Sequence, residues 1–272
     1  MNAIAKAFQK TKEGGNGALI GYVTAGDPTP ELTPKIADAL IQGGVDILEL
    51  GLPFSDPIAD GPTIQAASVR ALVAGTTPLK VLQIAKEIRK SHETPIVIMT
   101  YYNPVFRTGL EKFCRLSKEF MVDGVIVPDL PVEESGDYKK AAAKFGLDTI
   151  FLAAPSTTPE RLKAIVQCSS GFLYLVSHFG VTGAKTAVED STIQLIKRVL
   201  PVTSGKINLA VGFGVSKPQH VKRIVAAGAD GVIVGSAFID LIQKTQDDTV
   251  AMLKELEAVA SEMKKATKIL EK

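Results

Sequence analysis

Residues 45–62 read VDILELGLPFSDPIADGP and join a short apolar run to a loop stiffened by prolines. Glu49 interrupts the apolar run, and Gly51 and Pro53 end it, in the pattern of a short buried strand. A carboxylate among buried strand residues costs several kcal/mol unless it is paired, solvated in a cleft or protonated. The strand and the loop beyond it therefore bring two carboxylates that need an explanation, Glu49 and Asp60, to one rim of the fold.

Similar apolar runs recur along the chain. We expect strands at residues 19–24, 47–51, 96–101, 124–127, 149–152, 172–176, 207–211 and 231–234. Strands that alternate with helices pair in parallel through helical crossovers, and strands buried on both faces favour a closed barrel over an open sheet. The sequence therefore predicts an α/β fold, a single (β/α)8 TIM-barrel domain over residues 1–272.

Helical patterns fill the intervals between these strands. They lie at residues 33–43, 63–74, 79–91, 109–121, 134–145, 159–169, 191–199, 218–227 and 237–265. An extra helix is expected at the N-terminus, and an additional helix after the second strand begins at Thr77 and Pro78. Residues 44–47, 122–125 and 229–232 are similar to one another, which predicts one repeated helix-to-strand turn at the same end of the barrel.

Composition and charge argue against several classes of function. The chain has 31 Lys and Arg against 29 Asp and Glu, a formal net charge of +2, and 46% of its residues are hydrophobic. Such a small charge argues against nucleic acid as a partner, and the apolar runs are too short to span a membrane. The N-terminus lacks a signal-peptide core, and Cys114 and Cys168 show no pairing motif. We therefore expect reduced thiols and a cytoplasmic protein.

In such a barrel, the chemistry lies at the carboxyl ends of the strands. The residues at the expected strand ends are Asp27, Glu49, Tyr101, Tyr102, Asn103, Asp129, Ser156, Ser177, His178, Gly212, Phe213, Gly214, Gly235 and Ser236. Gly214, Gly235 and Ser236 follow the last two strands, where glycine N–H groups and a helix start typically bind phosphate. Gly183, after the sixth strand, is a further candidate for this phosphate site. The same glycines also fit a purely structural role in tight turns.

Glu49 and Asp60 are the candidate proton donors and acceptors. A half-buried carboxyl in a barrel mouth has a pKa raised by desolvation, which suits general acid–base catalysis near neutral pH. The alternatives are a structural ion pair for Glu49 and a turn for Asp60. Aromatic residues are candidates for lining a cavity, with core packing as their alternative: Tyr22, Tyr101, Tyr174 and Phe213.

Other catalytic chemistries lack their residues. The histidines, His92, His178 and His220, do not have metal-ligand spacing, so no metal site is expected. No lysine lies at an expected strand end, which argues against a Schiff-base mechanism, and neither a G-x-S-x-G motif nor a P-loop is present. What remains is proton chemistry by carboxylates on a small phosphorylated molecule, without a metal or a cofactor.

Residues 48–62 resemble the signature of the tryptophan synthase alpha subunit family. Residues 151–159, 174–183 and 212–215 are similar to the same family, and the likeness extends over essentially the whole chain. Members of this family are TIM barrels that cleave indole-3-glycerol phosphate to indole and glyceraldehyde 3-phosphate. They work beside a beta subunit that holds pyridoxal phosphate and receives the indole through a tunnel. The resemblance implies a lyase of tryptophan biosynthesis in an alpha2beta2 tetramer, with no cofactor of its own.

The resemblance also implies roles for particular residues. Glu49 matches the catalytic acid–base group and Asp60 the second essential carboxylate. The predicted substrate-binding residues are Tyr22, Tyr101, Tyr174 and Thr182, the phosphate-binding residues are Gly183, Phe213, Gly214, Gly235 and Ser236, and the partner-contact residues are Pro53, Phe54 and Asp56. The chain departs from many family members at His178, where they have arginine, and at Tyr22, where they have phenylalanine.

Two other functions fit the sequence. In the first, the chain is mainly an allosteric binding partner that keeps the ligand site but turns over slowly alone. In the second, it is another phosphate-binding barrel enzyme of tryptophan or histidine biosynthesis, although the strand-end lysine and the cysteine–aspartate pair expected of such enzymes are absent.

Overall fold

Nine parallel strands form the sheet of the computed structural model, in which the described residues are 2–176, 185–212 and 214–269, the side chains of 185–189 excepted. The strands are β1 (Ala18–Thr24), β2 (Ile47–Gly51), β3 (Ile96–Met99), β4 (Gly124–Ile126), β5 (Asp148–Ile150), β6 (Leu152–Ala153), β7 (Phe172–Val176), β8 (Asn208–Gly212) and β9 (Gly231–Val234). They lie in the order β5-β4-β3-β2-β1-β9-β8-β7-β6, and these neighbouring strands pair in parallel.

Residues 148–153 close this sheet into a barrel. β5 pairs with β4 and β6 pairs with β7, and only Phe151 separates the two short strands. The Phe151 carbonyl accepts a hydrogen bond from the Tyr174 N–H at 3.1 Å, so the ladder to β7 continues across the break. β5 and β6 are therefore one bent strand, and the predicted α/β barrel of eight strands is confirmed.

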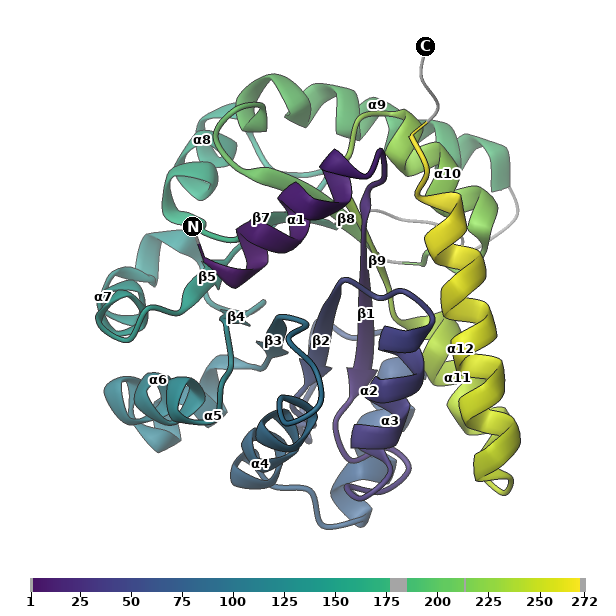
Figure 1. The fold of residues 1–272 in the computed structure, drawn as a ribbon. Coiled ribbons are helices and arrows are strands. Elements are labelled where there is room, and N and C mark those ends of the chain that lie inside the picture. The colour runs from purple at the N-terminus through teal and green to yellow at the C-terminus, as the bar shows by residue number, and fades with distance from the viewer. Residues whose placement is uncertain (1, 177–184, 213, 270–272) are drawn as a thin grey trace.

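The helices surround the strands (Figure 1). They are α1 (Ala3–Glu13), α2 (Thr33–Gln42), α3 (Pro62–Val73), α4 (Pro78–Ile88), α5 (Tyr102–Thr108), α6 (Leu110–Glu119), α7 (Gly136–Lys144), α8 (Pro159–Cys168), α9 (Lys185–Thr203), α10 (Pro218–Ala226), α11 (Ser236–Thr245) and α12 (Thr249–Ala266), with a short 3-10 helix at Val132–Glu134. The predicted N-terminal helix and the additional helix after β2 are present as α1 and α4. None of the described helices is long and apolar enough to cross a membrane.

Some of the predicted helices and strands differ from the structure. The pattern at 237–265 forms two helices, because Asp248 starts α12 by accepting a hydrogen bond from the Ala251 N–H at 3.0 Å. The predicted third strand extended to residue 101, whereas β3 ends at Met99 and the unpredicted helix α5 begins three residues later. α5 stops at Gly109, whose φ of 88° is one that residues with a side chain rarely adopt.

Apolar side chains fill the amino-terminal half of the barrel interior. α1 contributes Ile4 and Phe8, and the ring of Phe8 packs against that of Phe172 with centroids 5.9 Å apart. Three residues at the other end of this cluster are only partly buried: Met99, Leu152 and Tyr174. α1 therefore plugs the amino-terminal end of the barrel, and the open space lies at the carboxyl ends of the strands.

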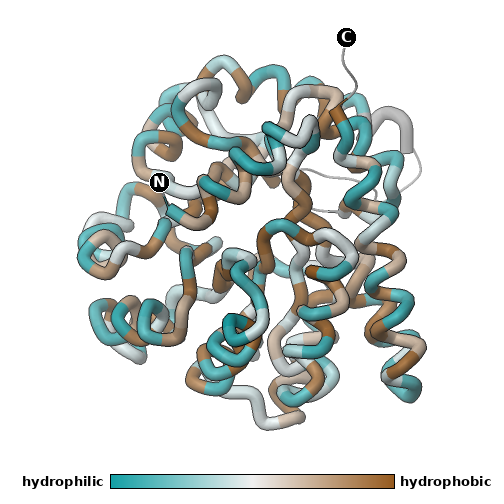
Figure 2. The backbone as a smooth tube through the Cα atoms, viewed as in Figure 1, coloured by the Kyte–Doolittle hydropathy of each residue, from teal (hydrophilic) through white to brown (hydrophobic). Residues whose placement is uncertain are grey.

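The outer faces of the strands pack against the helices in a second, larger apolar cluster. Figure 2 shows the helices alternating between hydrophobic and hydrophilic residues along their length. Helices of this kind bury one face against the sheet and leave the other in water. The strands, which are buried on both sides, are accordingly mostly apolar, and Glu49 of β2 is a charged exception among them.

One polar interaction repeats at the amino-terminal end of the barrel. An aspartate just before a strand exchanges two hydrogen bonds with a residue of a neighbouring strand: its N–H donates to that residue's carbonyl, and its carboxylate accepts from that residue's N–H. The pairs are Asp46 with Leu19, Asp123 with Ile96 and Asp230 with Leu209, at carboxylate distances of 2.7, 2.9 and 2.8 Å. These aspartates belong to the three similar stretches of sequence, so the predicted repeated turn is confirmed.

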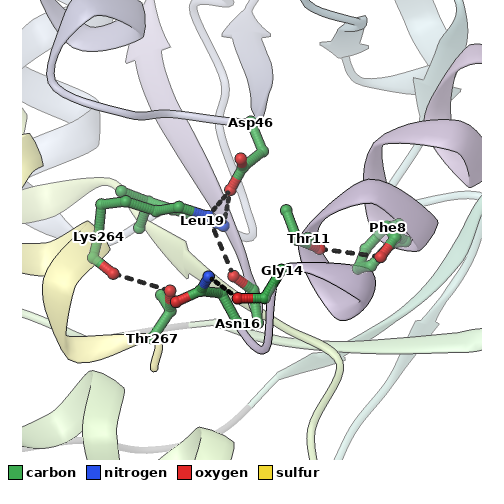
Figure 3. Close-up of polar contacts among 9 residues, drawn as sticks. Phe8, Thr11, Gly14, Asn16, Leu19, Asp46, Lys264 and Thr267 are labelled. Atoms are coloured by element: carbon green, nitrogen blue, oxygen red, sulfur yellow. Dashed lines mark hydrogen bonds and ion pairs between the residues drawn. The ribbon is translucent and has the colours of Figure 1, made fainter. Parts of the chain in front are cut away.

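Hydrogen bonds join α12 to the amino-terminal end of the barrel (Figure 3). Lys264 of α12 donates to the Asp46 carboxylate at 2.7 Å and to the Gly17 carbonyl at 3.3 Å. The Thr267 carbonyl accepts a hydrogen bond from the Gly17 N–H at 2.9 Å. Burial raises the pKa of Asp46, and the Lys264 ammonium opposes that rise. These contacts hold α12 beside the start of β1.

We expect Asp123→Ala to lower the free energy of unfolding by about 1.5–3 kcal/mol, because it removes a hydrogen bond from the Ile96 N–H to a charged acceptor. Asp123→Asn keeps a side-chain oxygen that accepts from the same N–H, so its cost should be clearly smaller. Urea unfolding of both variants measures the difference. Equal losses would show that the hydrogen bond to Ile96 does not stabilise the barrel.

Candidate active site

A cavity of about 310 Å³ opens at the carboxyl ends of the strands. Both predicted catalytic carboxylates, Glu49 and Asp60, line it. Five other predicted site residues share the lining: Tyr22, Tyr174, Gly214, Gly235 and Ser236. Much of the remaining wall is apolar and comes from Ile64, Met99, Ile126, Leu152, Val176 and Ile233. The structure thus brings the two carboxylates and part of the predicted phosphate site together around one largely apolar space.

The alternation of strand side chains determines which residues reach this cavity. Ile47 belongs to the packed barrel interior, and Glu49 lies two positions further along β2. Side chains on a strand return to the same face every second residue, so Glu49 points inward, one layer above Ile47. The same step of two leads from the interior residues Ile20, Val97, Ile150 and Phe172 to the lining residues Tyr22, Met99, Leu152 and Tyr174.

Glu49 is buried at the base of the cavity, with 1% of its surface exposed. Among the described residues, neither of its carboxyl oxygens has a hydrogen-bond partner. Burial raises its pKa from 4.5 to about 8, and the Asp60 carboxylate adds to the rise. Glu49 is therefore a protonated carboxyl group at neutral pH that faces an open space, the opposite of a structural ion pair.

Asp60 ends the loop between β2 and α3, just before Gly61 at the start of that helix. Gln65 of α3 donates a side-chain hydrogen bond to the Asp60 carbonyl at 2.8 Å. Burial raises the pKa of the Asp60 carboxyl, and a hydrogen bond with the Tyr101 hydroxyl lowers it in part. The cavity therefore holds two carboxyl groups of different character, one without a described partner and one whose pKa the Tyr101 hydroxyl lowers.

Two tyrosines stand near Glu49, and glycines make room for them. Tyr22 of β1 is the register partner of Glu49, and a Cβ at Gly51 would collide with its hydroxyl. In the same way, a Cβ at Gly212 would lie 2.6 Å from the hydroxyl oxygen of Tyr174. Burial raises the pKa of both phenols, so both groups are neutral hydroxyls in the wall of the cavity.

The predicted phosphate site is described in part. Gly214 and Gly235 follow β8 and β9, and Ser236 is the first residue of α11. Gly214 has a φ of 73°, which favours glycine, and the start of α11 presents backbone N–H groups that suit a bound anion. Three further predicted residues, Thr182, Gly183 and Phe213, lie outside the described residues, and their contacts stay predictions.

Tyr101 is not among the residues that line the cavity. Its ring lies against Phe54 with centroids 5.4 Å apart, and its hydroxyl accepts a hydrogen bond from the Ala59 N–H at 2.9 Å. It therefore supports the loop that carries the predicted partner-contact residues, of which Pro53 is buried and Asp56 exposed. Its direct contact with a substrate stays a prediction.

Two other strand-end carboxylates serve the fold. Asp27, which is 1% exposed, accepts two hydrogen bonds from Arg70 of α3 at 2.7 and 2.8 Å. Asp129 accepts a hydrogen bond from the Tyr102 N–H at 2.8 Å, at the start of α5. Neither lines the cavity. Over the described part of the chain, no group of three His, Cys, Asp or Glu side chains is placed to hold a metal ion.

The apolar wall of the cavity is not among the features predicted from the sequence. The signal was nonetheless present, because Met99 and Leu152 each lie two positions beyond an apolar residue of the barrel interior. Counting two residues onward from each interior position finds them in the same way as it finds Glu49. Pro128 obeys the same rule, because it lies two positions beyond the interior residue Ile126, whereas Ile64 of α3 has no such signal.

Comparisons with known proteins show the family of this chain. A family model described as the tryptophan synthase alpha chain matches residues 8–268. The tryptophan synthase alpha chain of Methanoregula boonei is 47% identical over 266 residues, 98% of each chain, and that of Methanosarcina barkeri is 48% identical over 265 residues, 97% of each. The solved tryptophan synthase subunit alpha of Legionella pneumophila has a TM-score of 0.88 at 37% identity, and the match covers 99% of this chain and 100% of that one. A chain of the tryptophan synthase a2b2 complex of Pyrococcus furiosus has a TM-score of 0.85 at 42% identity, with 91% and 98% covered.

We expect Gly212→Ala to destabilise the chain by about 1–3 kcal/mol, because the added Cβ overlaps the Tyr174 hydroxyl. Tyr174→Phe removes the oxygen that the Cβ would meet. The double variant should therefore be more stable than the sum of the two single effects implies, by at least about 0.5 kcal/mol. Thermal unfolding of the four proteins measures this coupling, and strict additivity would place the Tyr174 hydroxyl elsewhere.

The buried Glu49 carboxyl also makes stability depend on pH. The pKa of Glu49 rises on folding from 4.5 to about 8, so the folded state binds this proton more tightly than the unfolded state does. Between those pH values the unfolded state is ionised and the folded state is still protonated, so the free energy of unfolding of the wild type falls as the pH rises. Glu49→Gln removes this titration. Its unfolding free energy relative to wild type should rise by on the order of 3 kcal/mol between pH 5 and pH 8. The exposed Glu255→Gln is the matched control, and a difference between Glu49→Gln and wild type that does not change with pH would contradict a raised pKa.

Proposed function

The chain belongs to the tryptophan synthase alpha chain family, whose members cleave indole-3-glycerol phosphate to indole and glyceraldehyde 3-phosphate, and from this premise we propose how its own residues perform the reaction. The observation that carries the proposal is the buried, protonated Glu49 carboxyl facing a cavity that Asp60 also lines. A proton donor and a second carboxylate in an apolar space suit acid–base cleavage of a carbon–carbon bond.

We propose that the phosphate lies at the start of α11. Gly214, Gly235 and Ser236 line the cavity there, and the free N–H groups of a helix start favour an anion. The indole ring then occupies the apolar part of the cavity, beside side chains such as Met99 and Leu152. Anchoring the phosphate fixes the orientation of the bond to be cleaved, which converts binding energy into positioning.

Glu49 carries the proton steps in this proposal. Its protonated carboxyl donates to C3 of the indole, and the ring becomes an iminium that accepts electrons. The resulting Glu49 carboxylate then takes the proton of the side-chain hydroxyl; the O–H electrons form the aldehyde carbonyl, and the electrons of the breaking carbon–carbon bond restore the indole ring. One proton is given and one is taken back, so Glu49 returns to its starting state. A pKa of about 8 suits both directions near neutral pH.

Asp60 stabilises charge rather than moving a proton. When C3 is protonated, positive charge develops at the ring nitrogen, and a carboxylate that accepts the ring N–H hydrogen bond lowers the energy of that state. The Tyr101 hydroxyl lowers the pKa of Asp60, which favours the ionised form. The low-dielectric cavity weakens this electrostatic interaction less than water would. The position of the Asp60 carboxylate therefore matters more than its basicity.

We propose a pyridoxal-phosphate-dependent beta subunit as the partner and the cytoplasm as the compartment. The Pyrococcus furiosus chain matched above belongs to a tryptophan synthase a2b2 complex. Ile58 and Phe106 are 81% and 66% exposed, and they follow the strands that end at the cavity, so they give a partner an apolar surface to cover. Cys114 and Cys168 are free thiols, as in a reducing compartment.

We expect Glu49→Gln to lower the rate of indole release by about 10²–10⁴-fold, because the proton donor is lost while the cavity keeps its shape. Asp60→Asn should reduce the rate less, because an amide oxygen still accepts the ring N–H. The measurement is indole release by the isolated chain and after addition of a beta subunit.

Fluorescence titration with indole-3-propanol phosphate checks that each variant still binds the ligand. Wild-type turnover by Glu49→Gln would contradict its role. Undetectable turnover by wild type in both assays, with binding retained, would favour the alternative in which the chain is only a binding partner.

A further inference from the structure

Tyr101 is held rigidly between two elements of the barrel. Thr100 donates its backbone N–H to the Ile126 carbonyl of β4 at 3.0 Å, and the Tyr102 N–H binds the Asp129 carboxylate at 2.8 Å. The Tyr101 side chain is 4% exposed. Its backbone is therefore fixed on both sides, while its side chain crosses to the loop between β2 and α3.

The side chain grips that loop at two points. The ring packs against Phe54 with centroids 5.4 Å apart and an interplanar angle of 31°. The hydroxyl accepts a hydrogen bond from the Ala59 N–H at 2.9 Å, and it lowers the pKa of the adjoining residue, Asp60. Because the hydroxyl uses only a lone pair toward Ala59, its hydrogen can still point toward a neighbouring carboxylate. Phenylalanine keeps the ring contact and loses both effects of the hydroxyl.

We propose that Tyr101 is a positioning residue for the cleavage reaction: its hydroxyl holds the loop backbone at Ala59 and thereby places Asp60 at the edge of the cavity, and its ring ties that position to the loop at Phe54. The inference rests on the proposed role of Asp60 in stabilising the indole ring. Tyr101 itself does not line the cavity, so it acts through Asp60 and not on the substrate. A change in the loop at Phe54 is thereby transmitted to the charge that the reaction needs.

The same geometry predicts a pH signature. Burial raises the pKa of Asp60 and the Tyr101 hydroxyl opposes the rise, so loss of the hydroxyl raises this pKa further. Asp60 acts as a carboxylate, so the acid limb of the activity profile then moves to higher pH. The described titratable groups that interact with Asp60 are Glu49 on β2, Tyr22 on β1, Tyr174 on β7 and Tyr101. The tyrosines have raised pKa values and stay neutral there, and Glu49 titrates at about 8, on the alkaline side.

The test is Tyr101→Phe in the full chain with a beta subunit added. We expect kcat to fall about tenfold, KM to change by less than about threefold, and the acid limb of kcat against pH to move upward. Tyr102→Phe is the matched control, because it removes a hydroxyl from the next residue, whose ring packs against Phe106 at 6.1 Å. That control should keep the kcat and the pH profile of wild type.

A double-variant cycle separates positioning from general stability. In an Asp60→Asn background, Tyr101→Phe should lower kcat by less than about threefold, because its target is already changed. A wild-type kcat and pH profile in Tyr101→Phe would overturn the proposal, and so would an equal tenfold loss in the Asp60→Asn background. Absence of indole release by wild type would instead overturn the proposed function, so the two failures are distinguishable.

Thermal unfolding establishes first that Tyr101→Phe is folded. If it is not, Phe54→Leu removes the ring contact and keeps the hydroxyl. Its kcat must then fall in the wild-type background and stay unchanged in the Asp60→Asn background. Any other result with that variant overturns the proposal.

Discussion

The removal of one carboxyl group from water is the constraint on which this site depends. Glu49 is buried at the base of a largely apolar cavity, and none of the described groups hydrogen-bonds its carboxyl oxygens. In water, the group would lose its proton well below neutral pH; in the cavity, burial holds that proton to about pH 8. Burial of the Glu49 carboxyl destabilises the folded state, and it also provides a proton donor where the reaction needs one.

Carboxyl side chains have different roles at the two ends of the barrel. At the amino-terminal end, Asp46, Asp123 and Asp230 each accept a backbone N–H and fasten neighbouring strands together. At the carboxyl end, Glu49 is left without a described partner, and the pKa of Asp60 is lowered by the Tyr101 hydroxyl behind the cavity lining. The residues that stabilise the barrel and the residues proposed for the chemistry thus lie at opposite ends of its axis. α1 closes the amino-terminal end, so the cavity can open only at the carboxyl end.

Much of this arrangement could be predicted from the sequence, because the strands are short apolar runs and Glu49 is a visible exception within one of them. The step of two residues along a strand then identifies the inward layer. What could not be predicted depends on contacts between distant residues. Asp27 looks like a site residue until Arg70, 43 positions away, neutralises it, and the break in the helix at 237–265 depends on a local cap at Asp248.

The most direct test of this account is the titration of Glu49 itself. Carbon-13 NMR of the chain labelled at the glutamate side-chain carboxyl, with Glu49→Gln used to assign the resonance, reports its protonation as a function of pH. The account predicts that the Glu49 carboxyl titrates near pH 8. A Glu49 resonance that titrates at or below 4.5 would contradict the central claim, because the group would then be ionised at rest and unable to donate the first proton.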